Sequence, residues 1–588
     1  MKKADLRPQG DQKLTTPWGE ALDERRVLME YPRPQMRRDS YLNLNGRWEY
    51  AVTEEDGIPE NWDGSILVPF SPESALSGVG RTLLAGQTLW YRRELTVPEG
   101  FIPPGGRLLL HFGAVDQEAS VYVNGTLLGR HMGGYNAFSL DVTDALGAKN
   151  TLVVGVHDDT DGSFHSRGKQ RTRRGGIWYT PQSGIWQTIW AEAVPRRHIE
   201  SLRIVPLFDQ AAVQVTVGCR EPLHCEASVD GRTVPFTSGE PAIIPMPDFR
   251  AWSPEDPYLY DLVVTLGDDR VESYFGMRKT EVRMDRDGVK RLFLNGMPYF
   301  QSGLLDQGYW PDGLYTAPSD EALIHDIRTA KAMGFNMLRK HIKVEPMRWY
   351  YHCDRLGMLV WQDMPCGGSK YRFSTVTLPL VTGIHRRDNH YRAFGRASAQ
   401  GRAEYMDELE EMVAQLFNAP SVVLWVPFNE GWGQFDSTRV MERLRALDPT
   451  RPVDPASGWH DQGAGEMRSW HVYFKPFRFR RDRRGRAVAL SEFGGYNLRV
   501  EGHCFGGGDY GYRRLREAGR LWQDFARLYE RQVLPAIPRG LCAAVYTQLS
   551  DVEDELNGLM TYDRRVVKLD AEDVRELNRR LYEASPRT

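Results

Sequence analysis

Short runs in which apolar and polar residues alternate dominate the chain up to about residue 280, and this pattern is typical of β-strands. Between about 40 and 195 the runs are rich in β-branched and aromatic residues and are bounded by turn residues. Asn124-Gly125 predicts a hairpin, because both residue types tolerate the positive φ angles of a type I′ turn. The stretch 196–280 continues in the same style. Two successive β-sandwiches are predicted, and the second has the size of an immunoglobulin-like domain.

The pattern changes near residue 290, where apolar runs begin to alternate with helical segments. Around 404–416 apolar residues recur every three to four positions, which predicts an amphipathic helix with Glu404, Asp407, Glu408, Glu410 and Glu411 on its other face. Eight apolar runs predict the strands of a (β/α)8 barrel. They are 298–305, 335–339, 358–362, 421–428, 451–457, 469–473, 487–493 and 541–549.

These patterns predict a multidomain protein that combines β and α/β folds. We expect a jelly-roll-type β-sandwich at 1–195, an immunoglobulin-like β-sandwich at 196–282 and a TIM barrel at 283–588. A length of 588 residues fits several domains better than one, and 41% hydrophobic residues can form large cores.

Net charge, cysteine spacing and the lack of long apolar runs exclude several kinds of binding partner and structural site. The net charge of −3 argues against binding to nucleic acid or to an anionic membrane. The six cysteines lack CxxC spacing, so neither a zinc site nor a disulfide framework is predicted. Neither an apolar leader nor a run of 18 apolar residues is found, so we expect a cytoplasmic protein.

Two glutamates follow predicted barrel strands at the end where this fold places its chemistry. Glu430 comes after the fourth strand and Glu492 ends the seventh. Either alone could be a structural carboxylate with a partner. Strands four and seven lie across the barrel mouth from one another, so the carboxyl groups could approach to about 5–5.5 Å, the spacing of retaining glycosidases. Repulsion at that distance would keep one of them protonated near neutral pH.

The chain resembles glycoside hydrolase family 2, which includes β-galactosidases and β-glucuronidases, over nearly its full length. The segments that carry the likeness are 44–48, 123–125, 184–187, Asn429-Glu430 and 491–494. The resemblance implies that Glu430 is the acid/base, that Glu492 is the nucleophile and that Asn429 binds the sugar 2-hydroxyl. Members that use Mg²⁺ carry further acidic ligands that are not located here, so no metal and no cofactor is predicted.

The remaining candidate site residues each have a structural alternative. Arg339-Lys340-His341 stands where the family carries Arg-x-Ser-His-Tyr-Pro, so Arg339 is expected to contact the nucleophile or to be structural, and His341 is kept as a candidate. Tyr473 resembles the family tyrosine that binds the nucleophile, and otherwise caps the barrel. His471 is either a substrate contact or a core residue. Trp459 could stack on a sugar, as Trp432 could, or pack in the core.

Two loops of the barrel are strongly basic and favour an anionic substrate. Residues 366–402 and 474–486 each hold seven basic residues against one acid. The charge predicts a uronic acid whose carboxylate is bound by Arg or Lys, although solvated loops or subunit contacts are alternatives. The chain lacks the Asn-x-Lys pair of the β-glucuronidases it resembles, and Asn497-Leu498-Arg499 is the nearest substitute. A further basic run, 168–176, is interpreted as a sandwich loop that reaches toward the barrel.

The sequence therefore predicts a retaining exo-β-glycosidase that acts on a carbohydrate or glycoconjugate. The lead substrate is a β-uronide, with a galacturonide favoured over a glucuronide because Asn-x-Lys is missing. A neutral β-galactosidase is the first alternative, and a catalytically degenerate carbohydrate-binding protein is the second. A homo-oligomer is compatible with the family, but no segment of the chain argues for one.

Overall fold

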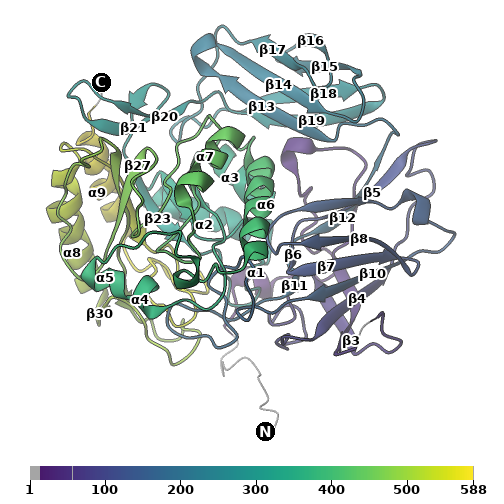
Figure 1. Ribbon diagram of the computed structural model, residues 1–588, viewed down its shortest axis with the longest axis horizontal. Coiled ribbons are helices and arrows are strands. Elements are labelled where there is room, and N and C mark those ends of the chain that lie inside the picture. The colour runs from purple at the N-terminus through teal and green to yellow at the C-terminus, as the bar shows by residue number, and fades with distance from the viewer. Residues whose placement is uncertain (1–13, 56, 587–588) are drawn as a thin grey trace.

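The first part of the chain forms a β-sandwich, hereafter the first sandwich. The computed structural model describes residues 14–55 and 57–586 (Figure 1). One sheet has the order β3 (Gly64–Val68), β2 (Gly46–Thr53), β4 (Thr88–Glu94), β10 (Thr151–His157), β7 (Glu118–Val123) and β8 (Thr126–Met132). The other has the order β1 (Leu42–Asn43), β12 (Ile189–Val194), β5 (Arg107–Phe112) and β9 (Phe138–Asp141). Their apolar faces form one core. The predicted hairpin is confirmed, with φ angles of 52° at Asn124 and 79° at Gly125 between β7 and β8.

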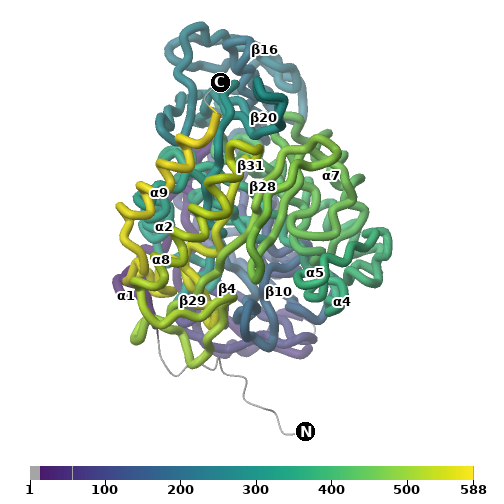
Figure 2. The backbone as a smooth tube through the Cα atoms, turned by 90° about the vertical axis from the view of Figure 1, so that its left-hand side faces the viewer, coloured from purple at the N-terminus to yellow at the C-terminus, as the bar shows by residue number. Residues whose placement is uncertain are grey.

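A second sandwich follows and packs on one end of the barrel (Figure 2). Its two sheets are fully antiparallel, and side chains from both enclose a separate core. The sheets are β13 (Ser201–Leu207), β14 (Ala212–Gly218) and β17 (Pro241–Pro245), and β16 (Arg232–Thr237), β15 (His224–Val229), β18 (Tyr260–Leu266) and β19 (Asp269–Phe275).

Seven parallel strands form the barrel sheet. In spatial order they are β26 (Val422–Val426), β25 (Leu359–Asp363), β24 (Met337–Lys340), β23 (Gln301–Asp306), β31 (Leu541–Thr547), β28 (Ala487–Gly494) and β27 (Met467–Val472). The segment 451–457, predicted as the fifth strand, makes only isolated parallel bridges among the described residues, Trp425 with Val453 and Asn429 with Ser457. Pro452 and Pro455 lack the N–H groups that a continuous ladder needs.

Helices cover the outside of the barrel, among them α2 (Asp320–Ala332), α3 (Met347–Leu356), α6 (Ala399–Leu416), α7 (Ser437–Leu447), α8 (Ala518–Leu528) and α9 (Ala571–Glu583). The amphipathic pattern correctly predicted α6, whose buried residues include Tyr405, Leu409 and Met412. None of the helices described by the structure is both long and apolar enough to cross a membrane.

The acidic face of α6 differs from the simple amphipathic expectation. Glu404 and Glu408 are buried, because the first sandwich packs across that face (Figure 1). Asn136 donates a hydrogen bond of 2.9 Å to the backbone oxygen of Glu408, and His165 Nδ1 lies 2.5 Å from Glu404 Oε1. The sandwich and the barrel therefore meet along polar as well as apolar contacts.

Candidate active site

The two predicted glutamates meet at the carboxyl ends of the barrel strands. Glu430 lies four residues after β26, and Glu492 lies near the end of β28. A carboxylate oxygen of each lies within 4.8 Å of the other. Glu430 has a φ of 52°, which is an uncommon backbone conformation for a residue with a side chain, and its N–H donates a hydrogen bond of 2.9 Å to Ser457 O. The irregular fifth strand segment therefore helps to fix Glu430.

Glu492 is surrounded by groups that favour its anionic form. Arg339 Nη1 donates to Oε1 at 3.0 Å, and the Tyr473 hydroxyl donates to Oε2. Burial alone would raise the pKa of the Glu492 carboxyl, but the nearby charges of His471 and Arg339 outweigh burial and lower it to about 2. Glu492 is therefore ready to act as a nucleophile.

Glu430 has the opposite electrostatic setting. Burial raises the pKa of its carboxyl, and the negative charge of Glu492 raises it further, while a hydrogen bond with His471 acts against both. The pKa of Glu430 is thus raised and that of Glu492 is lowered, as expected for a proton donor beside an anion.

His471 stands between the two carboxylates. Its Nδ1 lies 2.8 Å from Glu430 Oε1, and its Nε2 lies 3.6 Å from Glu492 Oε1 and 3.0 Å from Ser457 Oγ. The ring of Trp459 meets the His471 ring edge-on, with the centroids 5.6 Å apart. Both residues lie at the site, and His471 contacts the glutamates directly.

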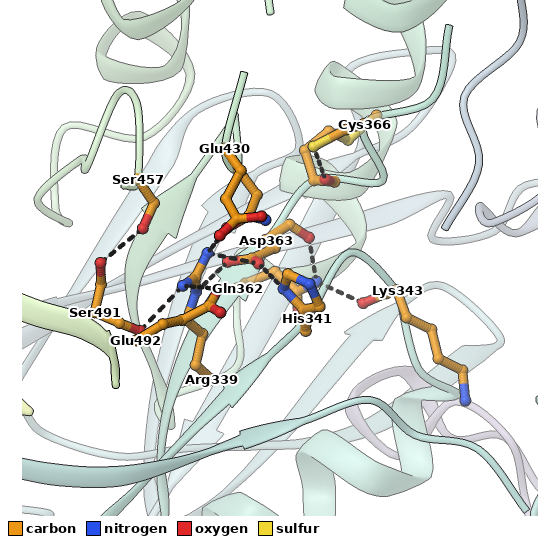
Figure 3. Close-up of polar contacts among 12 residues, drawn as sticks. Arg339, His341, Lys343, Gln362, Asp363, Cys366, Glu430, Ser457, Ser491 and Glu492 are labelled. Atoms are coloured by element: carbon orange, nitrogen blue, oxygen red, sulfur yellow. Dashed lines mark hydrogen bonds and ion pairs between the residues drawn. The ribbon is translucent and has the colours of Figure 1, made fainter. Parts of the chain in front are cut away.

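Arg339 ties the site together from the end of β24. Its guanidinium is fully buried and binds both oxygens of Asp363, at 2.9 and 3.0 Å (Figure 3). It also donates to Asn429 Oδ1 at 2.8 Å, besides its bond to Glu492. His341 Nδ1 lies 2.8 Å from Asp363 Oδ2. The fork geometry of arginine therefore sets the relative positions of Glu492 and Asn429.

Asn429 retains a hydrogen-bond donor. Its side chain is 1% exposed, and Nδ2 has no partner among residues 14–55 and 57–586. A buried donor without a partner is costly, so a ligand hydroxyl at this point would be favourable. This is consistent with the expected contact to a sugar.

The same cluster has the residue types of a metal site. One atom each from Glu430, His471 and Glu492 lie within 4.8 Å of one another. However, the Arg339 guanidinium stands 3.0 Å from Glu492 Oε1 and would repel a bound cation. The absence of a metal from the chemistry stays a prediction.

Comparisons with known proteins agree with the three-domain fold. Three family descriptions match the chain: the sugar binding domain of glycosyl hydrolases family 2 at residues 81–186, glycosyl hydrolases family 2 at 198–278, and the TIM barrel domain of the same family at 316–475. Together they cover more than half of the chain. The chain belongs to glycoside hydrolase family 2.

Individual relatives within family 2 are distant. A putative β-glucuronidase of Formosa agariphila is 25% identical over 66% of this chain and 46% of its own length. A β-galactosidase of Thermoanaerobacter pseudethanolicus is 24% identical over 62% of this chain and 48% of its own length. The chain thus spans about half the length of these curated relatives. The crystal structure of a family 2 β-galacturonidase from Eisenbergiella tayi bound to galacturonate has a TM-score of 0.69 and 19% identity, covering 93% of this chain and 99% of that chain. This last likeness shows the fold.

In this family 2 chain the fold brings eight of the nine predicted site residues together around Glu430 and Glu492. Arg499 is the exception. It follows β29 (Tyr496–Leu498), pairs with Glu501 at 2.9 Å and donates to the carbonyls of Gly506 and Gly508. These contacts hold Arg499 within its own loop, and none of those described joins it to Glu430 or Glu492.

Several guanidiniums of the basic loops are also occupied by the protein itself. Arg396 is buried and donates to the carbonyls of Gly433 and Gly401. Arg486 binds Asp461 and Asp482. These residues hold loops in place, so the basic composition overstates the charge available to a substrate.

Three neighbours of the site were not predicted. Asp363 ends β25, and the strand-end rule that identified the glutamates could have found it. Tyr512 stacks on Tyr473 with ring centroids 3.8 Å apart, and no sequence signal indicates this. Lys169, from the basic run 168–176, reaches the barrel from the first sandwich and pairs with Glu555 at 3.7 Å.

Proposed function

We propose that this chain is a retaining exo-β-glycosidase that hydrolyses a terminal β-linked sugar by double displacement. The observation that carries the proposal is the pair of strand-end glutamates, whose carboxylate oxygens approach within 4.8 Å. This approach suits direct attack by one carboxylate better than activation of a water between two distant ones. The opposite pKa directions of Glu430 and Glu492 support the assignment of their roles.

The residues then act in two steps. Glu492 attacks the anomeric carbon while Glu430 gives its proton to the leaving oxygen, so the glycosidic bond breaks and a glycosyl ester forms. Forming the ester removes the negative charge of Glu492, which is one of the causes that raise the pKa of Glu430. Glu430 then takes a proton from water, and the hydroxide releases the sugar and restores both carboxyl groups.

The proposed substrate is a β-uronide, with a galacturonide ahead of a glucuronide. The names of relatives and of a structural neighbour support this range of sugars, since they include β-glucuronidase and β-galacturonidase activities. The order within the range rests on the missing Asn-x-Lys pair. A neutral β-galactoside is the second candidate, supported by the likeness to a β-galactosidase.

The test is a panel of p-nitrophenyl β-D-galacturonide, β-D-glucuronide, β-D-galactoside and β-D-mannoside. Glu492→Gln should lower kcat by at least about 10⁴-fold, because the covalent intermediate cannot form. Glu430→Gln should lower it by about 10²–10⁴-fold, and by less on a dinitrophenyl glycoside, whose leaving group needs no proton.

Glu442→Gln is the matched control, because Glu442 is exposed on α7 and the chemical change is the same. Wild-type activity in either glutamine variant of the site would refute the assignment. A wild-type protein that binds these sugars but releases no p-nitrophenol would instead be a carbohydrate-binding protein.

A further inference from the structure

A loop of the first sandwich, residues 165–180, brings a lysine to the barrel segment that follows the proposed acid/base. Lys169 is only 5% exposed, and its Nζ lies 5.4 Å from the centre of the Tyr179 ring and 6.0 Å from that of Trp432. Trp432 comes two residues after Glu430. Burial raises the pKa of Glu430 and lowers that of His341, and the positive charge of Lys169 lowers both. The ammonium group therefore lies beside the barrel segment that follows Glu430, and its charge acts on both Glu430 and His341.

The loop holds Lys169 in a fixed position. Its carbonyl accepts a hydrogen bond of 2.9 Å from Tyr179 N, and both neighbours in sequence bind the Tyr135 hydroxyl, Gly168 at 2.8 Å and Gln170 at 3.0 Å. Thr180 N donates to Glu553 Oε1 at 2.9 Å and anchors the end of the loop to the barrel. A cation held this way is preorganised for a ligand.

The hydrogen-bond donors of this ammonium are not used by the described protein. A lysine has three donors, yet Nζ makes no hydrogen bond among the described residues. Besides the two aromatic rings, it has an ionic contact of 3.7 Å with Glu555 Oε2. Both oxygens of Glu555 already accept hydrogen bonds, Oε2 from the Tyr179 hydroxyl and Oε1 from Asn557 at 3.0 Å. A buried charge with unused donors favours an oxygen anion from a ligand.

The two arginines predicted for the site are engaged elsewhere in the protein. Arg339 uses its donors on Asp363, Asn429, Glu492 and a backbone carbonyl. Arg499 is held within its own loop. The carboxylate receptor expected from the basic loops therefore has a better placed candidate on another domain.

We infer that Lys169 is a specificity residue that binds the carboxylate of a uronide sugar at this site. The inference rests on the proposed function and names the group that distinguishes a uronide from the neutral galactoside. It assigns sugar selectivity to a residue of the first sandwich, while both glutamates belong to the barrel.

The experiment compares kcat/KM for p-nitrophenyl β-D-galacturonide, β-D-glucuronide and β-D-galactoside in the wild type, Lys169→Met and Lys169→Arg. The nitrophenyl group has no carboxylate, so any selectivity arises from the sugar. In Lys169→Met the ratio of the preferred uronide to galactoside should fall by at least about 30-fold, because a buried charge pair is lost. Lys169→Arg keeps the charge and should keep most of the ratio. Arg173→Met is the matched control, since Arg173 is an exposed cation of the same loop.

The pH profile on the neutral galactoside tests whether Lys169 lies near Glu430, independently of any carboxylate on the sugar. With the galactoside, the high-pH limb of kcat/KM should move to higher pH in Lys169→Met, since a charge that lowers the pKa of Glu430 is removed. Equal losses on uronides and galactoside, or a wild type that prefers the galactoside, would overturn the inference and leave the glycosidase standing. Release of no p-nitrophenol from any glycoside would overturn the proposed function as well.

Discussion

The hydroxyl of Tyr473 can be removed with little disturbance to its surroundings. It donates a hydrogen bond to Glu492 Oε2 from the residue after β27. The ring lies parallel to that of Tyr512, with an interplanar angle of 11° and a centroid distance of 3.8 Å. Tyr473→Phe keeps the ring and the stack, so the change reports on the hydrogen bond.

The expected magnitude follows from the charge of the acceptor. A hydrogen bond to a charged group contributes about 1.5–3 kcal/mol, which corresponds to about 10- to 150-fold in rate if the bond orients the attacking carboxylate. Glu492 keeps its bond of 3.0 Å to Arg339, so it should remain an anion near neutral pH. Removing Tyr473 as a donor to the charged form should raise the pKa of Glu492.

The assay is kcat/KM between pH 3 and 9 on the best substrate of the panel, with enzyme stability checked at each pH. We expect a drop of one to two orders of magnitude at neutral pH, and a low-pH limb that moves upward. Tyr512→Phe is the control, because its hydroxyl donates to neither glutamate in the described chain. A Tyr473→Phe enzyme within twofold of the wild type, with an unmoved limb, would show that this contact does not position the nucleophile.

Two further predictions concern pH. Burial and the charge of Glu492 raise the pKa of Glu430. Activity should fall as pH rises through this pKa, because the acid must hold its proton. The high-pH limb of kcat/KM should therefore be missing in Glu430→Gln on a dinitrophenyl glycoside. Burial raises the pKa of Glu408 to about 8, above its unfolded value of about 4.3, so the stability from its proton is present below about pH 4 and is lost as pH rises through 8. Glu408→Gln should therefore have a higher Tm than the wild type at pH 9 but not at pH 5. Asp407 lies on the exposed face of α6, so a similar gain in Asp407→Asn would show that burial of the carboxylate is not the cause.

Local patterns were sufficient for most of the fold and for the two glutamates. Strand alternation and helical periodicity depend on residues that are close together in the sequence. The sandwiches, α6 and the ends of β26 and β28 could therefore be predicted. The fifth strand is less regular than its sequence pattern predicts, because Pro452 and Pro455 interrupt it. Proline removes donors whatever the surrounding pattern.

Long-range contacts account for the remaining differences. Glu404 and Glu408 are buried by the first sandwich, which the periodicity of α6 cannot reveal. Arg499 lies close to Glu492 in sequence, but its loop turns it toward Glu501. Lys169 was visible only as part of a basic run, since its position depends on how two domains dock.

The 165–180 loop also has a consequence for the order of folding. Trp178 of this loop packs against Trp432 of the barrel, and Tyr179 and Thr180 bind Glu555 and Glu553 after β31. The first sandwich encloses one hydrophobic core and the barrel strands line another that contains no residue of the first sandwich, so each domain can collapse before the two dock. The wall of the site that these contacts build is therefore a late structure, which forms only when both domains are folded and joined.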